Sequence, residues 1–405
     1  MGHTLPIGMV ALMVISEPLL SQEIPEHFHP VRPMSMGGAF TAIANDENAV
    51  WTNPGGISRI RKHRSRSTVS LVKFPNGIAG VNTSGKDFYT SLKTDPTGAA
   101  STVAANSENL ESKPFWAMGA AFPMIMFNFG RQAPAVLGGF SHTTFKAVID
   151  EEDPLFAKTE IVSDIGGVMS FGFTNRTNRF NVGFQARSIG RYALEDTIPV
   201  AEFLDETELQ KRFEETSNRS AALAVDVGMM WTLADFWFPT IGIAMLNAPL
   251  GCKTDYLNPF TKLRETVCGT VFQGEFSNPD AISTVDPTDI RAGISIMPRI
   301  TRKIALRIAV DGHHIHQASG NLNYGFSGIP PLKTVHAGVE LHFGNPLKPA
   351  PLSVAAGMSQ GFYSMGASLR LGFLSVDVAT FGRDISSTSV PQEDRRTMGG
   401  FSFDF

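Results

Sequence analysis

Hydrophobic and polar residues alternate along most of this chain. In the segment RFNVGFQARS, one face of an extended backbone would carry only apolar side chains: Phe180, Val182, Phe184 and Ala186. The same alternation recurs in LAVDVGMMWTL, DIRAGISI, KIALRIAVD, TVHAGVELHF and YSMGASLRLGF. Because successive side chains of a strand point to opposite faces, the pattern predicts a series of β-strands, each with one apolar face.

The character of the two faces indicates where these strands lie. The apolar face extends over about ten residues per segment, the length that a tilted strand needs to cross a bilayer. The other face combines small residues with isolated charges of both signs: Arg187, Asp226, Arg291, Arg307, Asp311, Glu340, Arg370 and Asp377. Strands in hydrocarbon satisfy their backbone hydrogen bonds only in a closed barrel, so we expect an all-β, transmembrane antiparallel β-barrel with a polar lumen.

Short and long connections follow one another along the chain, as they do in membrane barrels. The short connections lie at 174–179, 234–239, 298–302, 344–350 and 372–375, and the long ones at 190–218, 248–286, 312–332 and 383–395. Counting back from the last strand predicts about 14 strands, near 66–83, 115–128, 134–148, 158–173, 179–190, 219–233, 239–247, 286–297, 303–312, 333–343, 351–359, 362–371, 374–382 and 396–405.

The first 62 residues do not fit this scheme. The apolar run Leu5–Ile15 is too short to span a membrane as a helix but suits a secretory signal, so we expect a signal peptide at 1–21, with a buried N-terminal helix as the alternative. Residues 22–62 lack alternation and precede the first strand, which indicates a plug (or hatch) inside or beneath the barrel. The barrel itself would then occupy 63–405.

A specific sequence pattern lies within the plug, between Arg32 and Ser58. It reads RPMSMGGAFTAIANDENAVWTNPGGIS, in which paired glycines and a Pro-Gly turn follow one another. The order Met-Gly-Gly-Ala-Phe, an acidic pair, Ala-Val-Trp and Asn-Pro-Gly resembles the N-terminal hatch of the FadL/toluene-transporter superfamily of outer-membrane proteins, especially its PorV-like branch. Asn53-Pro54-Gly55-Gly56 departs from the usual Asn-Pro-Ala-Gly, although it keeps the turn.

The C-terminal third carries the resemblance further. LRLGFLSVDVATFGRD and EDRRTMGGFSFDF are similar to the last strands of PorV-like barrels, and Phe401, Phe403 and Phe405 alternate with polar residues up to the last position. The resemblance implies that these aromatics form the signal that the barrel-assembly machinery recognises. It also implies location in the outer membrane of a Gram-negative-type bacterium, in contact with outer-membrane lipid and lipopolysaccharide.

For function, the resemblance implies a transporter or channel for hydrophobic small molecules such as long-chain fatty acids. Soft and aromatic side chains of the plug suit apolar ligands, although core packing explains them equally well. The candidate plug and ligand residues are Met34, Met36, Gly37, Gly38, Phe40, Trp51, Asn53 and Pro54. The alternative is a PorV-like anchor or secretion accessory that binds a secreted or surface protein, for which the long loops and a predicted amphipathic helix at 200–215 would serve.

Charge and cysteine content narrow these alternatives. A net charge of −4 excludes nucleic acid as an expected partner, because nucleic-acid binders carry a basic excess. Cys252 and Cys268 lie in one polar segment of a chain expected to be exported, which predicts a disulfide rather than a metal site.

Motifs for catalysis or metal binding are weak. Ser141 and His142 are adjacent and would point to opposite faces of a strand, and neither a nucleophile elbow nor a phosphate-binding loop is present. The DGHHIH stretch at 311–316 is the best metal candidate, but a strand end that enters a polar loop explains it better. The acidic DEEDP stretch at 150–154 is similarly interpreted as a solvated loop rather than a calcium site. We therefore expect neither an enzyme nor a cofactor.

Overall fold

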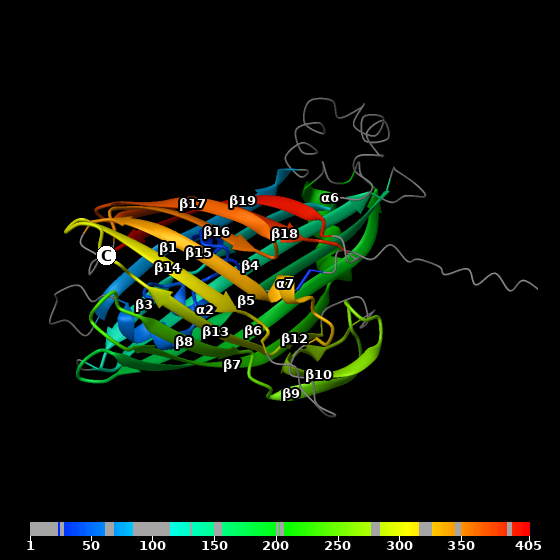
Figure 1. Ribbon diagram of the computed structural model, residues 1–405. Coiled ribbons are helices and arrows are strands. Elements are labelled where there is room, and N and C mark those ends of the chain that lie inside the picture. The colour runs from blue at the N-terminus through cyan, green and yellow to red at the C-terminus, as the bar shows by residue number, and fades with distance from the viewer. Residues whose placement is uncertain are drawn as a thin grey trace, which may run out of the picture.

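The computed structural model describes residues 23–24, 28–60, 69–83, 114–129, 132–149, 156–199, 202, 206–276, 284–315, 326–344, 350–386 and 391–405. Within these residues, 14 antiparallel strands form a closed barrel, if β2 and β3 are counted as the two parts of a single strand (Figure 1). Closure is made by β1 pairing with β19. The predicted fold class and strand number are confirmed.

Strand bounds follow the predicted ones closely. The barrel strands are β1 Val69–Asn82, β2 Phe115–Ala121, β3 Met124–Asn128, β4 Pro134–Ile149, β5 Phe156–Thr174, β6 Phe180–Pro199, β7 Asn218–Thr232, β8 Thr240–Leu246, β13 Asp289–Ile296, β14 Ile304–Gly312, β15 Val335–Phe343, β16 Leu352–Ser359, β17 Phe362–Leu371, β18 Leu374–Asp384 and β19 Glu393–Asp404. β6 runs nine residues beyond its predicted end at 190, because its ladder with β5 continues as far as Phe156 and Pro199.

The alternation of the sequence separates the outside of the wall from the lumen. On β5, for example, Met169, Phe171 and Phe173 face outward and are 37% to 51% exposed, whereas Val168 and Ser170, on the opposite face, are buried. The charged face lies inside, where Arg187, Asp226 and Glu340 are among the buried residues. Among the described residues, no helix is both long enough and apolar enough to span a membrane.

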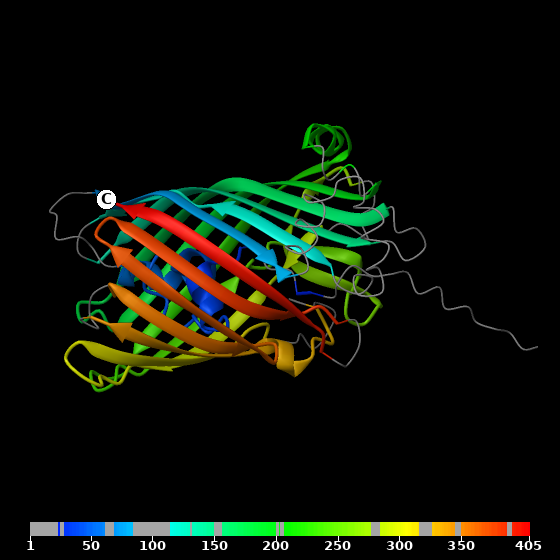
Figure 2. The ribbon, with the colours of Figure 1, turned by 90° about the horizontal axis from the view of Figure 1, so that it is seen from above.

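The two ends of the barrel differ. Short turns and the C-terminus lie at one end, here called the short-turn end, and the larger connecting elements lie at the other, the long-loop end (Figures 1 and 2). Exposed aromatics gather at the short-turn end: Phe129, Phe236, Trp237, Phe373 and Phe405. This placement fits the aromatic girdle of a membrane barrel. Phe405 exchanges two backbone hydrogen bonds with Val72, so the chain ends where the last strand finishes pairing with the first.

Structured elements cover the long-loop end. The segment predicted as a long loop at 248–286 forms a small sheet of β9 Gly251–Leu257, β10 Arg264–Val271 and β12 Val285–Pro287, and Cys252 is bonded to Cys268 across it. The short strand β11 Gln273–Gly274 lies between β10 and β12 in the chain and pairs with β7, and the helix α7 Pro331–Thr334 directly precedes β15. The outer helix α6 begins at Glu206, later than the predicted residue 200, and packs Leu209 and Phe213 against apolar wall residues of the extended β5–β6 ladder.

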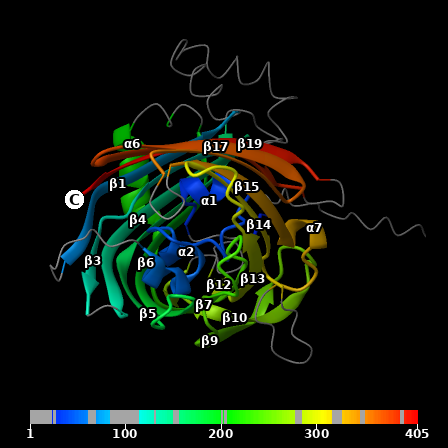
Figure 3. The same cartoon turned by 60° about the vertical axis from the view of Figure 1, so that its left-hand side comes forward.

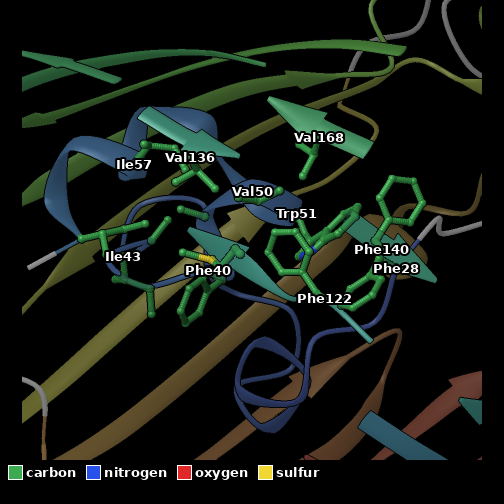
Figure 4. Packing of buried hydrophobic residues seen from close by; sticks show 14 of the residues in the cluster. Phe28, Phe40, Ile43, Val50, Trp51, Ile57, Phe122, Val136, Phe140 and Val168 are labelled. Atoms are coloured by element: carbon green, nitrogen blue, oxygen red, sulfur yellow. The ribbon is translucent and has the colours of Figure 1, made fainter. Parts of the chain in front are cut away.

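The described residues of the plug lie inside the barrel (Figure 3). Helices α1 Val31–Ser35 and α2 Ala49–Thr52 and the 3-10 helix η1 Pro54–Arg59 lie within the ring of strands (Figure 3). Apolar side chains of the plug and inward-facing residues of the wall form one buried core, which includes Phe40, Val50 and Ile57 of the plug, Val136 of β4 and Val168 of β5 (Figure 4). The predicted signal peptide at 1–21 lies outside the described residues. Of the predicted plug at 22–62, residues 23–24 and 28–60 are described.

Candidate functional site

Buried ion pairs fasten the plug to the wall. Arg32 of α1 donates two hydrogen bonds to Glu340 of β15, at 2.9 and 2.8 Å, and pairs with Asp46 of the plug itself. Arg307 of β14 donates to the same Glu340 at 2.5 Å. A buried carboxylate needs cationic partners to offset its desolvation. The Arg32–Glu340 pair therefore ties α1, which lies against β17 and β18, to β15 as well.

Wall side chains also bind the plug backbone directly. Asp311 of β14 accepts from the Thr41 N–H at 2.6 Å, Gln185 of β6 donates to the Val50 carbonyl at 2.8 Å, and Ser295 of β13 donates to Ala42. Asn53 donates to the Thr41 carbonyl within the plug at 2.8 Å, and to Met229 of β7 at 3.2 Å. The irregular plug backbone therefore satisfies its polar groups on the barrel interior, as a buried segment must.

The wall has glycines, which lack a side chain, where the plug comes closest to it. At seven inward positions among the described residues an added Cβ would lie less than 3.0 Å from a plug atom: Gly172, Gly183, Gly228, Gly242, Gly338, Gly357 and Gly366. Within the plug, Gly37 and Gly38 have positive φ of 66° and 84°, which explains the paired glycines of the sequence motif. Plug and barrel are thus matched in shape at backbone level.

The candidate ligand residues of the plug divide into two groups. Met36 and Phe40 are fully buried and Trp51 is 7% exposed, all in the plug core, while Met34 is partly buried beside Val31 and Trp116. The others shape and fasten the plug. Asn53 accepts from the Gly55 N–H at the start of η1, where Pro54 is the first residue.

An aromatic cluster surrounds Trp51. The ring of Phe28 stacks on Trp51 with centroids 4.2 Å apart and planes at 11°, while Phe122 and Phe140 present edges to Trp51 at 5.2 and 5.3 Å (Figure 4). Sequence reasoning did not include Phe28, Phe122 or Phe140. Phe122 lies at the interruption between β2 and β3, beside Pro123, and this break in the alternation was the available signal.

Cavities around the plug are small. One of about 60 Å³ is polar and lined by charged residues that include Arg32, Glu47 and Glu340. Three more, of about 20, 40 and 20 Å³, are each lined by both Phe28 and Trp51. Each of these four volumes is too small for a long apolar molecule, and the Phe28–Trp51 stack borders three of them.

A cluster of cations holds Glu23, toward the long-loop end. Its carboxylate accepts two hydrogen bonds from Arg396 of β19, at 2.7 and 2.9 Å, and lies 3.6 Å from the Lys146 ammonium and 3.7 Å from the Arg383 guanidinium. Trp116 lies under the Arg396 guanidinium at 4.3 Å. Burial by itself would raise the pKa of Glu23, but the neighbouring cations hold that pKa well below its usual range.

The residues of the weaker catalytic and metal motifs that the structure describes have other neighbours. His142 faces the lumen beside Phe28, with ring centroids 5.7 Å apart, whereas Ser141 is on the other face of β4. His313 stacks on His336, and Asp311 binds the plug. Among the described residues, His, Cys, Asp and Glu side chains do not form a group of three that could bind a metal, while His316 and the 150–154 stretch lie outside those residues.

Comparison with solved structures identifies the architecture. The chain superposes on the toluene transporter TbuX of Ralstonia pickettii with a TM-score of 0.52 and 12% identity, covering 94% of this chain and 99% of that one. For the toluene transporter TodX of Pseudomonas putida the TM-score is 0.51 at 8% identity, covering 95% and 99%. The chain has the fold of the toluene transporters.

A TodX variant described as a monoaromatic hydrocarbon channel matches similarly, with a TM-score of 0.54 at 8% identity over 93% of this chain and 98% of that one. No family model matches the sequence, and no curated protein matches it. The fold that the hatch motif implied is therefore confirmed, while membership of the FadL/toluene-transporter superfamily and of its PorV-like branch stays a prediction.

Proposed function

We propose that this protein is an outer-membrane channel for hydrophobic small molecules, with the long-loop end outside the cell. Support comes from the apolar outer wall, the toluene-transporter fold and the aromatic cluster in the lumen. In this proposal the periplasm lies at the short-turn end, as in other barrels of this class. The apolar belt would contact outer-membrane lipid, and lipopolysaccharide on its outer side.

The aromatic cluster is the observation that carries the proposal. Phe28 belongs to the chain's N-terminal segment, yet its ring fills a space bounded by Trp51, Phe122 and His142. An apolar guest of similar size would gain the same stacking and edge contacts. Withdrawal of Phe28 would also enlarge the three small cavities that it now lines.

Uptake measurements test this function. The gene would be expressed in a host that lacks its own hydrophobic-compound channels, and entry of labelled toluene would be measured. We expect the wild type to raise uptake, Phe28→Ala to raise it further by vacating the space, and Trp51→Ala to lower it. Phe173→Ala is the matched control, because Phe173 is 51% exposed on the outer wall. Wild-type uptake equal to that of the empty host would refute the proposal.

Long-chain fatty acids are our proposed substrates within this class. Arg396, Arg383 and Lys146 already hold a carboxylate, that of Glu23, beside the apolar residues Trp116 and Phe381. A fatty acid presents the same charged group with an apolar tail. Lys146→Gln should therefore lower uptake of a labelled long-chain fatty acid and leave toluene uptake unchanged. Equal effects on both substrates would leave the channel function standing and remove its fatty-acid specificity.

A second candidate is the surface anchor or secretion accessory, favoured by the ordered sheet at the long-loop end. Glu265 of β10 accepts a hydrogen bond from the Ser327 hydroxyl at 2.5 Å, and Asn258 donates to the Ser327 carbonyl, so two long connections form one surface unit. Such a unit could dock a secreted or surface protein. Cross-linking followed by purification would distinguish the candidates, since a stoichiometric protein partner favours the anchor.

A further inference from the structure

The seam between β1 and β19 is where the barrel closes. It joins the two barrel strands that are farthest apart in the sequence: Lys73 and Ser402, which are hydrogen-bonded across it, are separated by 329 positions. Its register is interrupted between Lys73 and Asn76. Pairing across such a separation carries a large entropic cost, so the seam needs stabilising contacts beyond its backbone ladder.

At the short-turn end, one ammonium joins both seam strands to the plug. Lys73 of β1 is 2% exposed, and its Nζ lies 2.8 Å from Glu47 of the plug and 2.9 Å from Asp404 of β19. An inward lysine without carboxylate partners would keep a buried, uncompensated charge. Glu47 therefore stabilises the side-chain position of Lys73 in which its Nζ also contacts Asp404.

Toward the long-loop end, a second joint repeats the arrangement. Asp394 of β19 accepts from Asn82 of β1 at 2.7 Å and from Arg396 at 2.8 Å. The same Arg396 donates two hydrogen bonds to Glu23. Asn82, Asp394 and Arg396 thus form a hydrogen-bond network that crosses the seam and ends on the Glu23 carboxylate.

Between these joints the plug packs on the seam itself. An added Cβ on Gly400 of β19 would lie 3.2 Å from Val31 of α1. Val31 shares a buried cluster with Met398 of β19 and Trp116, against which Ile78 of β1 packs. Contacts of the N-terminal segment therefore follow the seam along the lumen.

We propose that the plug, through Glu23, Val31 and Glu47, is the internal closing element of the barrel. The carboxylates of Glu23 and Glu47 supply the countercharges for inward cations on the closing strands, one at each joint. The first and last strands then pair stably only when the plug is in the lumen, which couples plug insertion to barrel closure. This role is independent of what the channel conducts.

Hydrogen–deuterium exchange of the purified full-length protein tests the proposal. Glu47→Gln and Glu23→Gln should each increase exchange on the order of tenfold or more in peptides of 69–82 and 393–405, because the loss of a buried partner opens the seam locally. Asp226→Asn is the matched control: it removes a buried carboxylate of β7 that pairs with Arg187, far from the seam in the strand order. It should leave both seam peptides unchanged.

A neutral seam separates charge pairing from general damage. The triple variant Lys73→Met, Glu47→Gln and Asp404→Asn removes all three charges of the first joint, so we expect it to recover most of the seam protection that Glu47→Gln loses. If Glu47→Gln fails to assemble, as judged by the gel mobility of the unheated barrel, assembly of Asp226→Asn and of the triple variant would support the proposal. Equal seam exchange in Glu47→Gln and Asp226→Asn would overturn it, as would equal failure to assemble.

Discussion

Replacing Gly183 with alanine would place a methyl group where wall and plug leave no space. Gly183 is on β6, and an ideal Cβ there lies 1.9 Å from the Pro54 carbonyl oxygen and 2.7 Å from the Gly55 nitrogen, against 3.4 Å for the start of ordinary contact. Plug and wall must therefore separate by about 1.5 Å at this point. Overpacking typically costs 1–3 kcal/mol. Because the clashing atoms are backbone atoms between the fastened residues Asn53 and Ser58, we expect the upper value, about 3 kcal/mol.

The cost should be local to the plug, because the wall keeps its strand pairing. Hydrogen exchange of peptides covering 49–60 should accelerate about 100-fold, the equivalent of about 3 kcal/mol of local opening, while peptides of β14 and β15 keep their protection. Gly139→Ala is the matched control, since the nearest atom to its added Cβ is 3.8 Å away. If Gly183→Ala and Gly139→Ala exchange alike in the plug, close packing of plug against wall does not hold it in place.

Three further outcomes are expected. Asn53→Ala leaves the Thr41 carbonyl and the Gly55 N–H without this partner, which should cost about 1–3 kcal/mol and lower the melting temperature in detergent; an unchanged melting temperature would contradict the role given to Asn53. Burial by itself would raise the pKa of Glu47, but Lys73 and Arg370 lower that pKa to about 2. The stability that Glu47 adds is therefore present above its ordinary pKa of 4.5 and is lost as the pH falls from 4.5 toward 2. Seam exchange compared across that pH range should therefore rise on acidification in the wild type beyond the intrinsic pH effect, and Glu47→Gln should lack this rise. Replacing Cys252 and Cys268 by serine removes a cross-link worth about 3 kcal/mol to its loop, so protease should cleave the small sheet faster without changing barrel melting.

The strand pattern could be predicted from the sequence because it obeys a local rule. Alternation of side chains is a property of each strand alone, and a bilayer outside with a polar lumen inside imposes the same alternation on every strand. The strand number and most strand bounds therefore followed without any knowledge of contacts. The end of β6 was missed because its last residues pair with β5 and face α6 rather than lipid, and partners of this kind leave no periodic signal.

The plug shows the opposite case. Its glycines, its Asn-Pro turn and its aromatic Trp51 were visible as a motif, yet the sequence did not say what each residue contacts. Phe28 on Trp51, Glu47 on Lys73 and Glu23 on Arg396 join positions that are far apart in the chain or differ in element, and only the closed barrel brings them together.

The sequence by itself thus predicted a membrane-spanning barrel with an N-terminal plug, because the hydrophobicity of each position indicates which face of a strand it occupies. Only the tertiary structure showed that buried ion pairs hold the plug along the closing seam, and that the Phe28 ring stacks on Trp51. The physical reason is that ion pairing and close packing depend on distances of a few ångströms between residues whose separation in the chain carries no such information.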